Sequence, residues 1–277
     1  MEAQATGNPV ILAVAPNGGR RGKADHPALP LSPLELARTA AECLEAGAAM
    51  IHTHVRKPDG GHLLDAEAYR TTIAAIRAAV GDRLVIQITS EALGLYAPAE
   101  QRAVVQAVRP EAVSLALREL LPDGSEEIAF AGFLAWLKRE EVTPQIILYT
   151  PQEARQLARL RERGMLPWED IAVLHVLGRY TPGQISSPRD LLPFLAPGQP
   201  DFGPWSVCAF GRRETACVTT AALLGGHARV GFENNLFRPD GNIAQSNGEM
   251  VSLTRRAIEG CGLWLGSADD LRAMRRT

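Results

Sequence analysis

Two histidines separated by one residue are the groups in this sequence best placed to do chemistry. His52 and His54 lie in the run Ile51 to Val55, which is apolar and β-branched as a strand requires. Successive side chains of a strand point to opposite faces, so both imidazoles share one face. A single buried histidine is more often a core residue, but a pair on one face favours a metal site. We therefore predict that His52 and His54 are metal ligands.

Eight short apolar runs alternate with segments of helical period along the chain. This alternation is typical of repeated βα units around a parallel sheet. Eight units favour closure into a (β/α)8 TIM barrel, because an open doubly wound sheet usually has fewer strands and a glycine-rich turn after the first. We predict one α/β barrel domain over residues 1–277. The predicted strands are residues 10–16, 49–55, 83–89, 112–118, 144–150, 171–177, 205–210 and 227–232, and the predicted helices are residues 32–47, 64–81, 98–110, 125–140, 151–164, 187–195, 211–226 and 244–262.

The histidine pair ends its predicted strand, and barrel active sites are built at that end of the strands. Catalytic zinc usually takes three protein ligands and leaves a place for water or substrate. Glu233 ends the last predicted strand, close to the second strand in a closed barrel, and could be the third ligand. From the residues alone, a helix-capping or surface role for Glu233 is the simpler interpretation. Two imidazoles and a carboxylate suit zinc, but also cobalt, manganese or iron.

The composition excludes several partner classes. The 31 acidic residues nearly balance the 29 basic ones, and no basic run is present, so neither nucleic acid nor an anionic membrane is an expected partner. No membrane-length apolar stretch and no secretory leader are recognisable, so we expect a cytoplasmic protein. The four cysteines lack CxxC spacing, and each is expected to be buried. The orientation of His175 stays open, and solvated or turn roles are expected for His26, His62 and His227.

Several segments together resemble the β-keto acid cleavage enzymes. They are ADHPALPLSPLELA, GAAMIHTHVRKPDGGHLLD, LVIQITS, WSVCAFGR, GGHARVGFENN and QSN. The resemblance implies a zinc-bearing barrel, commonly a homotetramer, that condenses a β-keto acid with acetyl-CoA and splits the adduct into acetoacetate and a new acyl-CoA. It also implies that His52, His54 and Glu233 hold the metal.

Further site residues follow from the same resemblance. Arg229, four residues before Glu233, would balance charge on the adduct, and hydroxyls of Thr89 and Ser90 would donate to the substrate carboxylate. A structural ion pair for Arg229 and strand-end capping for the hydroxyls are the plainer alternatives. Arg212 and Arg213 begin a predicted helix and could bind CoA phosphates there, or simply be solvated.

The sequence departs from the family pattern at acidic positions. Asn234 follows the predicted ligand where the relatives carry an aspartate, and an amide cannot accept and release a proton near neutral pH. We predict a catalytic position at Asn234 with altered chemistry. Two other functions therefore stay open: a metal-dependent aldolase or lyase that acts without CoA, and a barrel that binds metal and keto acid without catalysis.

Two more acidic segments of the relatives are lost here. The predicted fifth strand reads Pro144-Gln145 in place of Pro-Glu, and Gly18-Gly19-Arg20 stands in place of Gly-Ala-Glu. An ammonium-bearing substrate needs negative partners, so we predict a neutral or anionic keto acid. Asn17 and Arg20 are the predicted substrate-binding residues, and Arg20 or Arg21 could pair with a second carboxylate.

Overall fold

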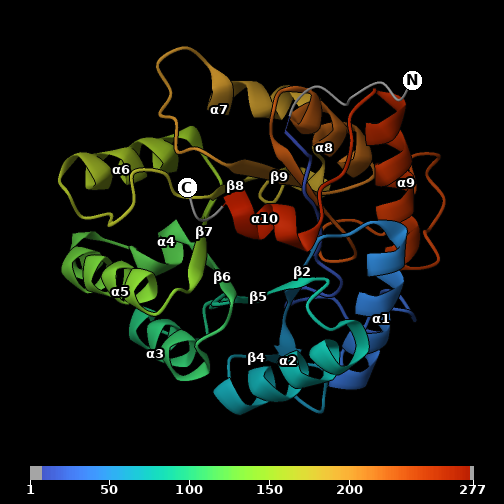
Figure 1. Ribbon diagram of the computed structural model, residues 1–277, viewed down its shortest axis with the longest axis horizontal. Coiled ribbons are helices and arrows are strands. Elements are labelled where there is room, and N and C mark those ends of the chain that lie inside the picture. Colours follow the sequence, from blue (N-terminus) through green and yellow to red (C-terminus); the bar gives the residue numbers. More distant parts are fainter. Residues whose placement is uncertain (1–7, 275–277) are drawn as a thin grey trace.

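The computed structural model of the protein describes residues 8–274 and contains a closed barrel of parallel strands, as predicted (Figure 1). The ends of the predicted domain, residues 1–7 and 275–277, lie outside the described residues. Around the barrel the order is β1-β10-β9-β8-β7-β6-β5-β2, so β1 stands between β10 and β2. The barrel strands are β1 (Leu12–Val14), β2 (Met50–Thr53), β5 (Val85–Thr89), β6 (Ala112–Ala116), β7 (Thr143–Leu148), β8 (Val173–Leu177), β9 (Trp205–Ala209) and β10 (His227–Val230).

Helices surround the barrel at the predicted places. They are α1 (Pro33–Ala46), α2 (Ala66–Val80), α3 (Pro98–Val108), α5 (Glu127–Arg139), α6 (Pro151–Glu162), α7 (Leu192–Leu195), α8 (Glu214–Leu223) and α9 (Asn247–Gly260). Local sequence fixes their ends: Ser32 and Glu35 form a capping box at the start of α1, and Gly47 ends it with a left-handed φ of 114°.

The sequence did not predict several shorter elements. These are helices α4 (Leu117–Leu120) and α10 (Ala268–Met274), the hairpin of β3 (Val55–Arg56) and β4 (His62–Leu63), and 3-10 turns at Gly124–Glu126 and Pro182–Gln184, while the helix predicted over residues 187–195 begins as a 3-10 turn at Pro188–Leu191 before α7. They are too short for a helical or strand period to be recognised. Helix α10 packs against the barrel interior at the amino-terminal ends of the strands, the lower end of the barrel (Figure 1). There Ala268 and Leu271 pack against Ala13, Met50 and Val85.

Strand alternation divides the side chains between two layers. Ile51 and Ile86 point outward into the core between barrel and helices, while Met50 and Val85 point into the barrel interior. His175 points outward, because its ring packs 4.5 Å from the ring of Phe194 in α7. The open question about His175 is thereby answered, and this residue lies away from the barrel interior.

Two expectations about polar residues are wrong. Cys261 is exposed, because it follows α9 on the surface, whereas the other three cysteines are buried. The solvated role expected for His26 and His62 is wrong, because both are buried, with ring nitrogens 2.8 Å and 2.7 Å from backbone carbonyl oxygens. The alternative turn role fits His26, whose Nδ1 accepts from the N–H of Ala28 at 3.1 Å, and His227 accepts from a more distant backbone N–H. Tertiary contacts remove these rings from water. Among residues 8–274, no helix has the length and apolar character that crossing a membrane requires.

Candidate active site

Three side chains predicted from two strands, the second and the last, converge at the carboxyl end of the barrel. The Nε2 atoms of His52 and His54 lie 3.1 Å apart, and Oε2 of Glu233 lies 3.4 Å and 3.2 Å from them. His52 lies in β2, while Glu233 lies three residues beyond β10. Strand β1 alone separates β2 from β10, and this adjacency brings the carboxylate to the imidazoles.

The three atoms fit one small cation. Ligand atoms about 2.0–2.1 Å from a tetrahedral zinc ion are separated by roughly 3.3–3.4 Å, close to the distances observed. Both imidazoles are buried, and within residues 8–274 Oε2 of Glu233 has no hydrogen-bond partner. Burial lowers the pKa of His52 to about 3, despite the opposing effect of Glu233, so its ring is neutral as a metal ligand must be. The donor set therefore fits a divalent metal.

A chain of amides orients His52. Its Nδ1 lies 2.8 Å from Oε1 of Gln87, which accepts the ring proton and leaves Nε2 with a free lone pair. Gln87 in turn donates to Gln145 at 3.2 Å, and Gln145 donates to Ser206 at 3.3 Å. Gln145, at a position where the resemblance led us to expect an acid, is thus a member of a buried hydrogen-bonded chain beside His52.

The loop after β1 holds His54 and Glu233 from the other side. The Asn17 side chain donates to the carbonyl oxygen of His54 at 2.9 Å and accepts from its N–H at 3.2 Å. Gly18 has a φ of 60°, and a Cβ there would lie 2.7 Å from Cγ of Glu233, so only glycine fits. Arg56 donates to the carbonyl oxygens of Gly18 and Arg21 and fixes this loop.

Arg229 neutralises the second oxygen of Glu233. Its Nη2 donates to Oε1 at 2.9 Å and to Sγ of Cys208 at 3.3 Å. Burial alone would raise the pKa of Glu233, but Arg229 and the two imidazoles hold that pKa well below its usual range. Glu233 is therefore ionised and available to a cation. The Nε and Nη1 atoms of Arg229 make no hydrogen bond to the part of the chain that the structure describes.

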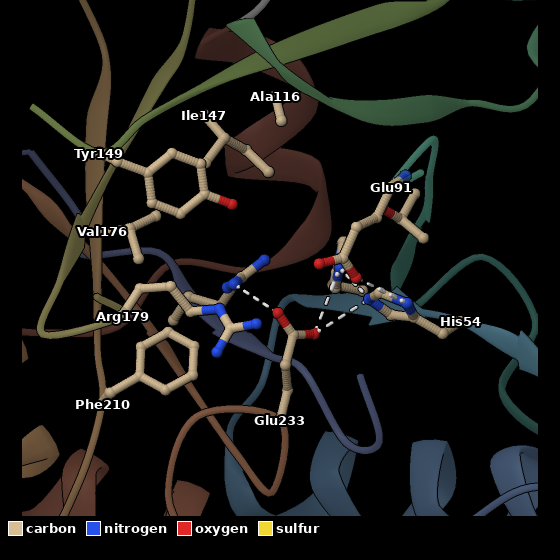
Figure 2. Close-up of a pocket in the computed structure, with 12 residues that line it drawn as sticks. His54, Glu91, Ala116, Ile147, Tyr149, Val176, Arg179, Phe210 and Glu233 are labelled. Carbon is tan, nitrogen blue, oxygen red and sulfur yellow. Dashed lines mark hydrogen bonds and ion pairs between the residues drawn. The ribbon is translucent and has the colours of Figure 1, made fainter. Parts of the chain in front are cut away.

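These groups border a cavity with two unlike walls (Figure 2). One wall is polar and holds the imidazoles, Glu91, Glu233 and Arg229. The other is largely apolar and consists of Ala116, Ile147, Tyr149, Val176 and Phe210. A second cavity shares Glu91, Arg179, Phe210 and Glu233 with the first and is also lined by residues 17–21. A cavity with one polar and one apolar wall suits a small polar molecule that has an apolar portion.

Comparison with known proteins shows to which family the chain belongs. The sequence profile described as beta-keto acid cleavage enzyme matches residues 9–275. This chain belongs to the β-keto acid cleavage enzyme family. It is 31% identical over 271 residues to the 3-keto-5-aminohexanoate cleavage enzyme of Fusobacterium nucleatum, covering 95% of this chain and 96% of the relative. It is 23% identical over 274 residues to the 3-oxoadipate:acetyl-CoA acetyltransferase of Cupriavidus necator, covering 96% and 94%.

The fold of this β-keto acid cleavage enzyme also occurs among solved structures. The apo structure of ObcA superposes with a TM-score of 0.70 at 17% identity, covering 90% of this chain and 66% of that one. A type I 3-dehydroquinate dehydratase from Clostridium difficile gives a TM-score of 0.59 at 12% identity, covering 92% and 94%. At these identities the likeness concerns the fold alone.

The structure brings some predicted residues of the family member to the cavities and not others. Thr89 lines the first cavity, and its hydroxyl accepts from the backbone N–H of Glu91 at 3.0 Å. Ser90 is buried outside the lining, where its hydroxyl donates to the carbonyl oxygen of Ser114 at 3.2 Å. Asn234 is also buried outside it, and neither polar atom of its side chain forms a hydrogen bond with any described residue.

The predicted arginines fall into two groups. Arg20 and Arg21 line the second cavity, and Arg21 also donates to the carbonyl oxygen of Phe232 at 2.5 Å. Arg212 and Arg213 are exposed at the start of α8, away from the lining of both cavities. The site is thus compact around the three predicted metal ligands, and the α8 arginines lie outside it.

Sequence reasoning missed Glu91 and Arg179, which line both cavities. The Oε2 atom of Glu91 lies 3.6 Å from Nδ1 of His54. Burial raises the pKa of Glu91, with His54 opposing that shift. Each residue follows a predicted strand by two positions, and the carboxyl ends of all barrel strands face the site. That position was the signal that could have found them.

Proposed function

We propose that this family member is a zinc-dependent enzyme that condenses a β-keto acid with acetyl-CoA and splits the adduct into acetoacetate and a new acyl-CoA. The observation that supports it is the convergence of two imidazole nitrogens and one carboxylate oxygen, 3.1–3.4 Å apart, at the edge of a cavity with an apolar wall. Bound zinc would polarise the keto and carboxylate oxygens of the substrate.

The chain's own groups are proposed to position the reactants. Thr89 presents a hydroxyl to the cavity and would donate to the keto acid, with Ser90 supporting the same strand end. Arg229 has two unpartnered nitrogen atoms beside Glu233, and these would stabilise negative charge that develops on the adduct. The apolar wall would exclude water from the reacting carbon atoms.

Proton movement is proposed to differ from that of the relatives. Asn234 can donate and accept hydrogen bonds but cannot take up a proton, so its catalytic part would be limited to hydrogen bonding. Glu91 is a carboxylate that lines the cavity on the side of His54. We propose that Asn234 changes the rate of proton transfer rather than the overall reaction.

Binding of the second substrate is proposed at the rim. Arg212 and Arg213 are exposed where α8 begins and would attract the phosphates of CoA. Asn17 and Arg20 line the second cavity and are proposed to contact the keto acid. A cytoplasmic homotetramer completes the proposal, and light scattering of the purified protein tests the assembly.

Metal analysis combined with product analysis tests the proposal. Purified protein is stripped with a chelator, reloaded with zinc, cobalt, manganese or iron, and supplied with β-keto acids in the presence and absence of acetyl-CoA. We expect acetoacetate and a new acyl-CoA to form only with acetyl-CoA and to be restored best by zinc. Product without acetyl-CoA would establish the CoA-independent lyase instead. Keto acid binding without turnover under every condition would establish the non-catalytic barrel.

A further inference from the structure

Arg179 lies where the two cavities meet. It follows β8 by two residues and lines the cavity of the metal ligands as well as the cavity of the β1 loop. Its guanidinium carbon lies 5.2 Å from the centre of the Phe210 ring, and Figure 2 shows the side chain beside Phe210 on the side that faces Glu233. The aromatic ring thus supports the guanidinium in a fixed place inside the substrate compartment.

The two cavities together carry an excess of positive charge. Their lining contains four arginines, at positions 20, 21, 179 and 229, and two carboxylates, at 91 and 233. Glu233 is paired with Arg229 at 2.9 Å. Over residues 8–274 no carboxylate oxygen lies within 4.0 Å of the guanidinium of Arg20 or Arg179. A divalent metal on the ligand triad would make the excess larger.

We infer that Arg179, assisted by Arg20, is the specificity-determining residue that binds a second carboxylate at the far end of the substrate, so the enzyme selects β-keto dicarboxylic acids. This inference rests on the proposed function. The first carboxylate and the keto oxygen belong near the ligand triad, while the second would pair with the planar Arg179 fork. A neutral substrate end would leave that guanidinium unpaired inside the cavity, and an ammonium end would be repelled.

A role of Arg179 in binding CoA phosphates is less consistent with its place. Arg179 shares one cavity with both imidazoles of the ligand triad. The phosphates of CoA lie at the opposite end of the pantetheine arm from the thioester, far from the reacting carbon atoms. The exposed arginines of α8 are open to such a long ligand, whereas Arg179 faces the compartment of the keto acid.

Substrate pairs of equal carbon number test the inference. They are 3-oxoglutarate with 3-oxopentanoate, 3-oxoadipate with 3-oxohexanoate, and 3-oxopimelate with 3-oxoheptanoate, each measured with saturating acetyl-CoA on zinc-loaded protein. We expect the wild type to prefer the diacid in at least one pair. Arg179→Met should lower kcat/KM for that diacid about 10–100-fold, the range of a charge-assisted carboxylate pair, and change the monoacid less than about threefold. Arg179→Lys should recover part of the loss.

Matched controls make the outcome decisive. Arg155→Met removes an exposed arginine of α6 that lines neither cavity and should leave the diacid preference unchanged. Calorimetry of keto acid binding without acetyl-CoA gives a readout that needs no turnover, and thermal melting of Arg179→Met checks its folding. Equal losses on diacid and monoacid, a raised KM for acetyl-CoA with unchanged diacid preference, or no tighter binding of any diacid would each overturn the inference. Tight Arg179-dependent diacid binding without cleavage would instead reject the proposed function alone.

Discussion

Strand β2 has different chemistry at its two ends. At the lower, amino-terminal end, Met50 points into the barrel interior, where it packs with Ala13, Val85 and Ala112 against α10. Two and four residues further along the same face stand His52 and His54, whose nitrogen atoms converge with a carboxylate. The lower end is a closed apolar plug. The upper end holds polar atoms that make no hydrogen bond within residues 8–274, among them Nδ1 of His54 and Oε2 of Glu233.

The two ends of the barrel thus have different roles, one in stability and the other in the active site. Apolar burial at the lower end stabilises the fold, since removing apolar surface from water contributes about 25 cal/mol per Å². Unpartnered polar groups at the upper end reduce stability, and they persist where a metal and substrate satisfy them. Substitutions at the two ends should therefore affect different measurements.

The largest effect is expected at the ligands. His54→Ala removes one of three metal ligands, so we expect the metal content to fall and kcat/KM to drop roughly a thousandfold or more. The metal-free variant should melt within a few degrees of the metal-free wild type, because the His54 ring contacts polar groups of the site and is not part of the hydrophobic core. Elemental analysis and an activity assay check this. Retention of stoichiometric zinc with full activity would show that His54 is not a metal ligand.

Substitution of Met50 should give the opposite result. Met50→Ala leaves a void next to α10 and should lower the free energy of unfolding by about 2–5 kcal/mol. Activity per folded molecule should stay within about twofold of wild type, since Met50 lies in the plug and lines neither cavity. Denaturant unfolding and active-site titration measure the two quantities. A variant that folds normally but loses activity would show that the two ends are coupled.

The amide chain marks how far the polar end extends into the barrel. Gln87→Leu removes the acceptor of the His52 ring proton, so the ring loses its fixed orientation, and metal affinity should fall about 10–100-fold. Gln87→Glu keeps an acceptor and should retain more of the affinity. Competition with a chromophoric chelator measures both. Equal metal affinities for the wild type and the leucine variant would show that Gln87 does not contribute to metal binding.

The smallest effect concerns a histidine on the outer face. Burial lowers the pKa of His175 to about 4, against about 6.5 in an unfolded chain. As pH falls below 6.5 the unfolded chain binds a proton that the folded protein does not, so stability is lost between pH 6.5 and 4. In the metal-free protein, His175→Leu should reduce the loss between pH 7 and 5 by about 1–2 kcal/mol. Activity should not change, and an unaltered pH slope would contradict the lowered pKa.

Much of this architecture could be predicted from local sequence. The apolar runs and helix caps identified all eight barrel strands and the surrounding helices, because strand alternation and capping depend on residues close in the chain. The spacing of His52 and His54 likewise determined that they share a face. Glu233 needed the family resemblance, since nothing near it in the chain distinguishes a ligand from a surface acid.

Only the tertiary structure decided what depends on residues distant in sequence. Closure through β1 brings Glu233 to within 3.2–3.4 Å of the imidazoles. The outward turn of His175, the amide chain through Gln145 and the positions of Glu91 and Arg179 also depend on neighbours from other strands. Sequence set the type and alternation of the side chains. The register and closure of the barrel determined which of them meet, because those contacts join segments up to about the whole chain length apart.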